Sequence, residues 1–219
     1  MKTILCVLAV FLGSFSPAHS DWVIIQKTVT EGQEKETTTK IKGAQARVDV
    51  GKEMSVITGA EGMQMLMHAQ KVIMEMDLAT MKAALEMAAK ASAPLDKQAA
   101  VKPVATGQKE RIGEWVAEVF TWDGPLGKGR FWVVRDFPKS AEINAINDRL
   151  GKTMGSALAG LAPQAADFNG MVVKSEMMMT GKSVSTLLVS AKEQEVDAKE
   201  FTAPEGYHEM KMPMLPGSK

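Results

Sequence analysis

Short segments in which apolar and polar residues alternate run through most of the chain, and this pattern predicts strands. Many are rich in Thr, Val and Ile, and turn residues separate them at intervals of about ten residues. Strands are expected at 23–30, 34–41, 46–50, 54–58, 63–68, 72–76, 111–122, 130–135, 171–180 and 183–191. Their regular spacing predicts an antiparallel sheet.

Two other segments have a helical period. The first is expected over 77–92, where Asp77 can cap the helix and apolar residues recur every three or four positions. The second begins at Ser140, a good N-cap residue, and ends before Pro163. Its apolar stripe consists of Ile143, Ile146, Leu150, Met154, Leu158 and Leu161. Residues 94–106, with two prolines and several Ala and Lys, are expected to form a loop.

The apolar stripe of each helix needs a surface to bury against, and a sheet with one apolar face provides it. A sheet of this size tends to curl. We therefore predict an α+β fold: a curled antiparallel sheet, or half-open barrel, of about nine to eleven strands, with two helices packed on its concave face.

The first twenty residues have the layout of a secretory signal peptide. Lys2 supplies the positive start, residues 4–12 form an apolar run, and small residues precede Asp21. The run is too short to span a bilayer, which needs about 20 residues. We expect residues 21–219 to form a single exported domain without a transmembrane segment, in the periplasm or outside a bacterial cell.

Composition narrows the possible partners. The chain has 26 basic and 26 acidic residues, and this balance gives no long-range attraction to nucleic acid. Its only cysteine, Cys6, lies in the predicted signal peptide, so the exported domain cannot form a disulfide. The 17 methionines are the unusual feature, because flexible thioether side chains suit irregular apolar partners and are also soft ligands for Cu(I).

Motifs for catalysis are absent from the sequence. Ser156 does not lie in a G-x-S-x-G nucleophile elbow, and the Gly-Lys pairs at 151 and 181 lack the upstream glycine of a phosphate-binding loop. Only two histidines, His68 and His208, follow the predicted signal peptide. We expect no catalytic residue, no cofactor and no enzymatic activity.

Three motifs resemble a known family. They are Thr106-Gly107-x-x-Glu110-x-Ile112-Gly113, then Trp132-Val133-Val134-Arg135-Asp136, and Phe201-x-x-Pro204-x-Gly206-Tyr207-x-x-Met210. Together they are similar to the bacterial exported family called domain of unknown function 4412. The resemblance implies a fold like that of the periplasmic lipoprotein carriers, a half-open antiparallel barrel with helices across its mouth. It implies no activity and no catalytic residue.

The leading functional hypothesis is that the concave face binds an acyl chain or another apolar, lipid-like molecule. The candidate ligand-binding residues are Met171, Val173, Met177, Met179, Met63, Met65 and Met67, of which the first four are expected to share one face of their strand. One alternative is periplasmic copper binding by two Met/His clusters, 63–68 and 208–214. Another is a structural or partner-binding protein whose core is filled, with no protein partner identified.

Overall fold

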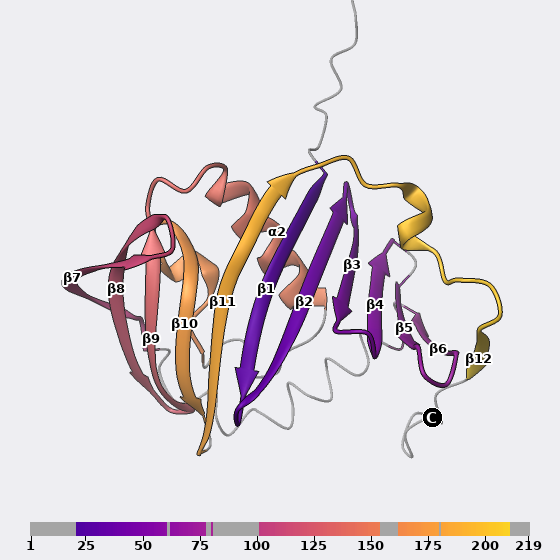
Figure 1. Ribbon diagram of the computed structural model, residues 1–219, viewed down its shortest axis with the longest axis horizontal. Helices are drawn as coiled ribbons and strands as arrows, with labels where there is room; N and C mark the ends of the chain where they lie inside the picture. The colour runs from indigo at the N-terminus through magenta and orange to yellow at the C-terminus, as the bar shows by residue number, and fades with distance from the viewer. Residues whose placement is uncertain are drawn as a thin grey trace, which may run out of the picture.

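The computed structural model describes residues 21–60, 62–77, 80, 101–153, 162–179 and 181–210. In these ranges twelve strands form one sheet that curls without closing (Figure 1). Their bounds are β1 Trp22–Thr30, β2 Gln33–Lys42, β3 Gln45–Val50, β4 Met54–Gly59, β5 Gly62–Met67, β6 Val72–Asp77, β7 Val104–Ile112, β8 Trp115–Gly124, β9 Gly127–Val134, β10 Met171–Met179, β11 Lys182–Glu193 and β12 His208–Met210.

The sheet order is β12-β6-β5-β4-β3-β2-β1-β11-β10-β9-β8-β7. Strands β1 to β6 form a meander on one side of the sheet, and β7 to β11 form the other side. The two halves join where β11 pairs with β1, so residues from both ends of the chain meet in the centre. All pairs are antiparallel except β12 with β6, which is parallel.

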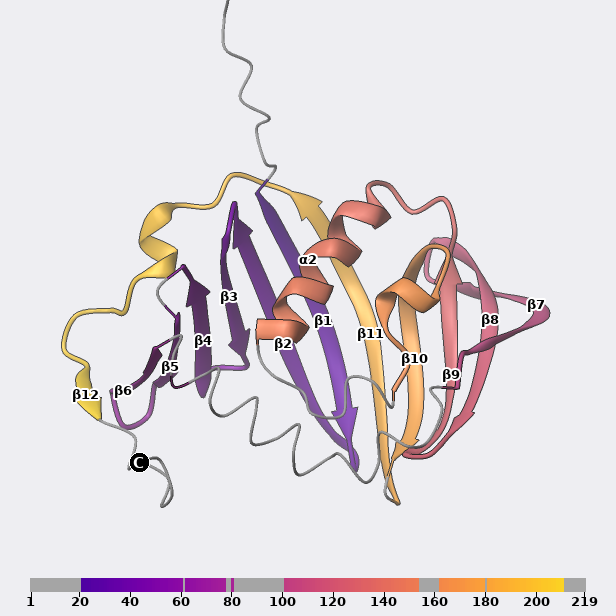
Figure 2. The same ribbon diagram turned by 180° about the vertical axis from the view of Figure 1, so that it is seen from behind.

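One α-helix, α2 (Ser140–Thr153), lies across the sheet among the described residues (Figure 2). The Glu142 carboxylate accepts a hydrogen bond of 3.1 Å from Trp22 Nε1, which fixes the helix over β1. Ile143 and Ile146 are buried in a cluster with Ile24 and other residues of β1, β2, β3, β8, β9, β10 and β11. We call the side of β1–β6 that carries Trp22 the helix face.

The opposite side of β1–β6 is covered by the segment that follows β11. This tail, residues 194–207, contains the short 3-10 helix η2 (Ala198–Phe201). Phe201 and Val196 pack in a buried cluster with Ile57, Leu66 and Ile73 of β4, β5 and β6. Partly buried neighbours pack against this cluster: Val23, Ala203 and Tyr207. We call this side the tail face. The sheet therefore has apolar cover on both faces.

The predicted fold class is confirmed in its coarse form, and the number of elements differs. Strand β7 begins at Val104 inside the predicted loop, and the turn at 113–114 divides the predicted strand 111–122 into the end of β7 and the start of β8. Strand β12 was not predicted, because three residues carry no alternation and the parallel pairing is non-local. The first predicted helix, 77–92, lies almost entirely outside the described residues, so the prediction of two helices holds for one of them.

Candidate functional site

Six methionines share the helix face of β4, β5 and β6. One continuous row of cross-strand partners runs from β1 to β6 without a register shift. It consists of Trp22, Ile41, Ala46, Thr58, Met63 and Met76. Since paired residues point to the same side of a sheet, this path places Met63 and Met76 on the face of α2. Alternation along the three strands adds the rest. We call the set the methionine surface: Met54, Met63, Met65, Met67, Met74 and Met76.

The methionine surface consists of cross-strand pairs. Met54 pairs with Met67, Met65 with Met74, and Met63 with Met76. Every member is half-buried, whereas the neighbouring Val56 is buried. The cluster that contains Ile143 and Ile146 of α2 includes no residue of β4, β5 or β6. Within the described part of the chain, the apolar stripe of α2 thus packs beside this surface and not on it.

A cleft of about 670 Å³ opens at the end of β5 and β6. Met63 and Met76 line it together with Gln64, Glu75 and Asp77. Ligand pockets are commonly about 300–1,000 Å³, apolar with a few polar groups. The three polar residues alternate with the methionines, so they lie on the tail face, where Phe201 also lines the cleft. The cleft therefore opens mainly on the tail face and only touches the end of the methionine surface.

The other predicted ligand-binding residues do not form one face, which corrects the sequence analysis. A register shift between Val172 and Lys174 interrupts β10. Met171 pairs with Val134 and Met177 with Gly129, and these partners in β9 are an odd number of residues apart. Because alternate residues of a strand point to opposite sides, Met177 and Met179 lie on the face opposite to Met171.

These residues also belong to different parts of the core. Met171 and Val173 are 3% and 0% exposed in the cluster that holds Ile143 of α2. Met177 packs against a separate cluster that contains Phe131. Beneath α2 a space of about 170 Å³ remains next to Met171 and Val173, which is small for an acyl ligand. The core beneath α2 is therefore largely filled, whereas Met177 lines an open cleft of about 620 Å³ at the ends of β8, β9 and β10.

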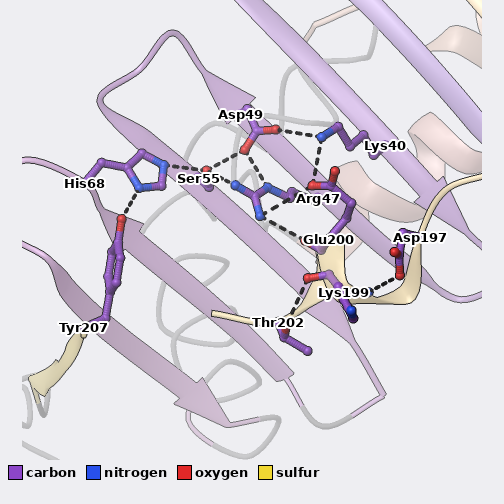
Figure 3. A network of polar contacts seen from close by, with 10 residues as sticks. All are labelled: Lys40, Arg47, Asp49, Ser55, His68, Asp197, Lys199, Glu200, Thr202 and Tyr207. Carbon is purple, nitrogen blue, oxygen red and sulfur yellow. Dashed lines mark hydrogen bonds and ion pairs between the residues drawn. The ribbon is translucent and has the colours of Figure 1, made fainter. Parts of the chain in front are cut away.

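His68 lies on the tail face, in a network of polar contacts (Figure 3). Its Nε2 is 2.7 Å from Ser55 Oγ, and its Nδ1 is 2.6 Å from the hydroxyl oxygen of Tyr207. Ser55 is fully buried and donates to Asp49, and Arg47 Nη2 donates to Ser55. Because Ser55 Oγ already donates to Asp49, the arrangement requires Nε2 to donate to Ser55 and leaves Nδ1 to accept from Tyr207.

This network attaches the tail to the sheet. Arg47 Nη1 donates to the backbone oxygen of Glu200, and Lys40 Nζ lies 2.9 Å from a Glu200 carboxylate oxygen. Ser55 is buried and hydrogen-bonded on every side, so it is not placed as a nucleophile. The copper hypothesis for 63–68 is wrong in its donor set, because His68 points away from Met63, Met65 and Met67 and both its ring nitrogens are hydrogen-bonded.

A second group of polar contacts anchors the start of β1. The Asp21 carboxylate accepts hydrogen bonds from Lys42 Nζ at 2.7 Å and from the backbone N–H of Val196 at 3.0 Å. The hydrogen bond from Lys42 is the main cause that lowers the pKa of Asp21 below its ordinary value, with Val196 acting in the same direction. The same pair raises the pKa of Lys42. Asp21 therefore links the start of β1 to β2 and to the tail.

Across the described residues, no group of three or more His, Cys, Asp or Glu side chains is placed to hold a metal ion. In the same part of the chain, no helix is long and apolar enough to cross a membrane. The predicted signal peptide, residues 1–20, lies outside the described residues. So do 211–214 of the C-terminal Met/His cluster.

Residues 23–207 match the family described as Domain of unknown function (DUF4412). The chain belongs to this family. The resemblance in three motifs is thus confirmed over most of the chain. A search of curated proteins gave no match.

Several solved structures are similar to this DUF4412 protein at low sequence identity. An uncharacterised conserved protein from Thermus thermophilus is 8% identical, with 88% of this chain and 91% of that chain covered and a TM-score of 0.52. The Mycobacterium tuberculosis lipoprotein LppX is 8% identical, with 80% and 88% covered and a TM-score of 0.43. A DUF1329 family protein from Desulfovibrio piger is 9% identical, with 85% and 91% covered and a TM-score of 0.32. The first of these supports the overall architecture alone.

Sequence reasoning found half of the methionine surface. It identified Met63, Met65 and Met67, and it missed Met54, Met74 and Met76 on the flanking strands. The lengths of the turns between these strands could have identified the three missed methionines. Once the hairpins are paired, alternation in β4 and β6 puts these three methionines beside the first three.

Proposed function

We propose that this protein is a non-enzymatic, exported binding protein for an apolar, chain-like molecule such as an acyl lipid. The methionine surface is the observation that carries the proposal. It offers six flexible apolar side chains on one face, outside the cluster of α2. Methionine adapts its shape to irregular apolar ligands because its side chain is unbranched and polarizable.

The free energy of binding would come from burial of the methionine side chains. An apolar chain that lies along Met65 and Met74 would contact the paired methionines of β5 and β6. Binding would then bury apolar area at about 25 cal/mol per Å².

The predicted ligand-binding residues of β10 are not part of the proposed site. Met171 and Val173 belong to the core beneath α2, so they support the fold and are not assigned to the ligand. Met177 and Met179 stand on the other face of β10 from Met171. The predicted ligand-binding residues that we retain are Met63, Met65 and Met67, joined by Met54, Met74 and Met76.

A titration with a fluorescent long-chain fatty acid tests the proposal. Met65→Glu puts a charge in the middle of the methionine surface, and Met178→Glu puts the same charge on β10, where the side chain is 52% exposed. We expect saturable binding to the wild type and to Met178→Glu, and at least a tenfold loss of affinity in Met65→Glu. Met65→Leu, which keeps the surface apolar, retains binding.

Thermal unfolding of each variant separates loss of binding from loss of folding. Should Met65→Glu not fold, Met63→Glu replaces it, because Met63 lines the open cleft and its carboxylate can reach water. No binding to the wild type, or equal affinity in folded Met65→Glu and Met178→Glu, would contradict the proposal.

A further inference from the structure

Strand β12 extends the methionine surface and adds the imidazole that His68 does not provide. In the parallel pairing of β12 with β6, His208 is the partner of Val72 and Met210 the partner of Met74. Val72 and Met74 lie on the helix face, because they pair with Met67 and Met65. His208 and Met210 therefore stand on the same face as the methionine surface.

The register places four soft donors next to one another. Met210, Met74 and Met65 form one row across β12, β6 and β5, and His208 is two residues from Met210 on the same side of β12. Neighbouring strands are about 4.8 Å apart, and residues two apart along a strand are separated by about 6.6 Å. The three rotatable bonds of methionine let thioethers at these spacings turn toward a common point.

The donors at this edge are accessible. Met210 is 53% exposed, and His208 is exposed as well. Only the backbone N–H of His208 is used, in a hydrogen bond of 2.8 Å to the Lys71 carbonyl, and no described residue hydrogen-bonds its imidazole. This differs from His68, whose ring nitrogens both contact hydroxyl groups.

The charge of the site selects the kind of ion. Glu209 alternates with His208 and Met210 and pairs with Ile73 of the tail face, so β12 brings no carboxylate to this face. Thioethers and a neutral imidazole are soft donors without charge, which suit Cu(I) and are poor ligands for hard divalent ions. We propose that His208, Met210, Met74 and Met65 bind one Cu(I) ion at the β12 edge of the methionine surface. This site uses a different chemistry from the proposed lipid function and does not rest on it.

Competition for Cu(I) tests the site directly. The purified protein is titrated with Cu(I), kept reduced by ascorbate, against a chromophoric Cu(I) chelator. We expect one ion per wild-type chain and at least a tenfold loss of affinity in both His208→Ala and the double variant Met65→Leu/Met74→Leu. The matched control is Met177→Leu/Met178→Leu, which removes two thioethers from β10 and leaves the affinity unchanged.

A titration with Ag⁺, which is not oxidised, locates the ion. We expect the methyl NMR signals of Met65, Met74 and Met210 to shift, and those of Met177 and Met178 to stay in place. Absence of one-to-one binding, or full retention in Met65→Leu/Met74→Leu, would overturn the site. Loss of binding only in Met212→Leu/Met214→Leu would also overturn it, by assigning the ion to the C-terminal run alone.

The lipid proposal and the Cu(I) proposal can be refuted independently of each other. Met65→Leu/Met74→Leu removes sulfur but keeps the surface apolar, so it is expected to lose Cu(I) and to retain the fluorescent fatty acid. A protein that binds the fatty acid but no Cu(I) would contradict the metal site and leave the lipid site standing.

Discussion

Replacing Tyr207 with Phe removes one hydrogen bond, that between its hydroxyl and His68 Nδ1 at 2.6 Å, and leaves the ring in place. The ring also meets the His68 imidazole edge-on, at 6.0 Å between centroids, and Phe can keep this contact. Both side chains are half-buried. A hydrogen bond of this kind contributes about 0.5–1.5 kcal/mol, so Tyr207→Phe should lower the free energy of unfolding by that amount.

His68→Ala should cost more, about 1–3 kcal/mol, because it also removes the contact with Ser55. Ser55 keeps Asp49 and Arg47 as partners in this variant, so no buried hydroxyl is left unsatisfied. The double variant Tyr207→Phe/His68→Ala then measures the coupling free energy between these two side chains. If the contact exists in solution, Tyr207→Phe costs nothing further once His68 is absent, and the coupling free energy is about 0.5–1.5 kcal/mol.

Urea unfolding followed by tryptophan fluorescence measures the free energy of unfolding of the wild type, the two single variants and the double variant. Hydrogen exchange at residues 202–210 adds a local measurement, since the tail should open more readily in both single variants. Additive single effects, with a coupling below about 0.3 kcal/mol, would refute the reasoning. His68 would then be free to take another role.

Three further predictions concern stability. Leu66→Ala, at a side chain with 0% exposure beneath the tail, should lower the free energy of unfolding by about 2–5 kcal/mol in urea. Gly127→Ala should cost more than about 1 kcal/mol in the same assay, because a Cβ at φ +147° would lie 1.9 Å from the Met178 carbonyl oxygen; equal stability would contradict this. The lowered pKa of Asp21 stabilises the fold above its unfolded pKa of about 3.9, and this contribution is lost as the pH falls through the lower folded value. Stability curves between pH 2 and 6 should thus be flatter in Asp21→Asn than in the wild type.

The local pattern of the sequence was enough to place most strands, because period-two alternation and turn residues are local signals. Strands β1 to β6 agree with their predicted positions to within one or two residues. Strand β7 was missed where it begins, since Val104 follows a proline and an exposed, polar run gives no alternation. Strand β12 depends on its partner β6 and on the hydrogen bond from His208 to Lys71, which no local pattern reveals.

The site was harder to predict than the fold for a specific reason. One unpaired residue in β10 reverses the faces of everything after it, so Met171 and Met177 separate although their spacing suggests otherwise. Likewise, the His68 side chain follows three methionines in sequence but points to the other face. Alternation correctly grouped Met63, Met65 and Met67 because β5 pairs on both sides without a shift.

A native mass spectrum of untagged protein from the exported fraction tests the central claim most directly. The account predicts the mass of a chain that starts at Asp21, together with a second species heavier by one acyl lipid. The heavier species should be absent from folded Met65→Glu and present in Met178→Glu. A spectrum that shows only the bare chain, before and after incubation with a long-chain fatty acid, would contradict the account.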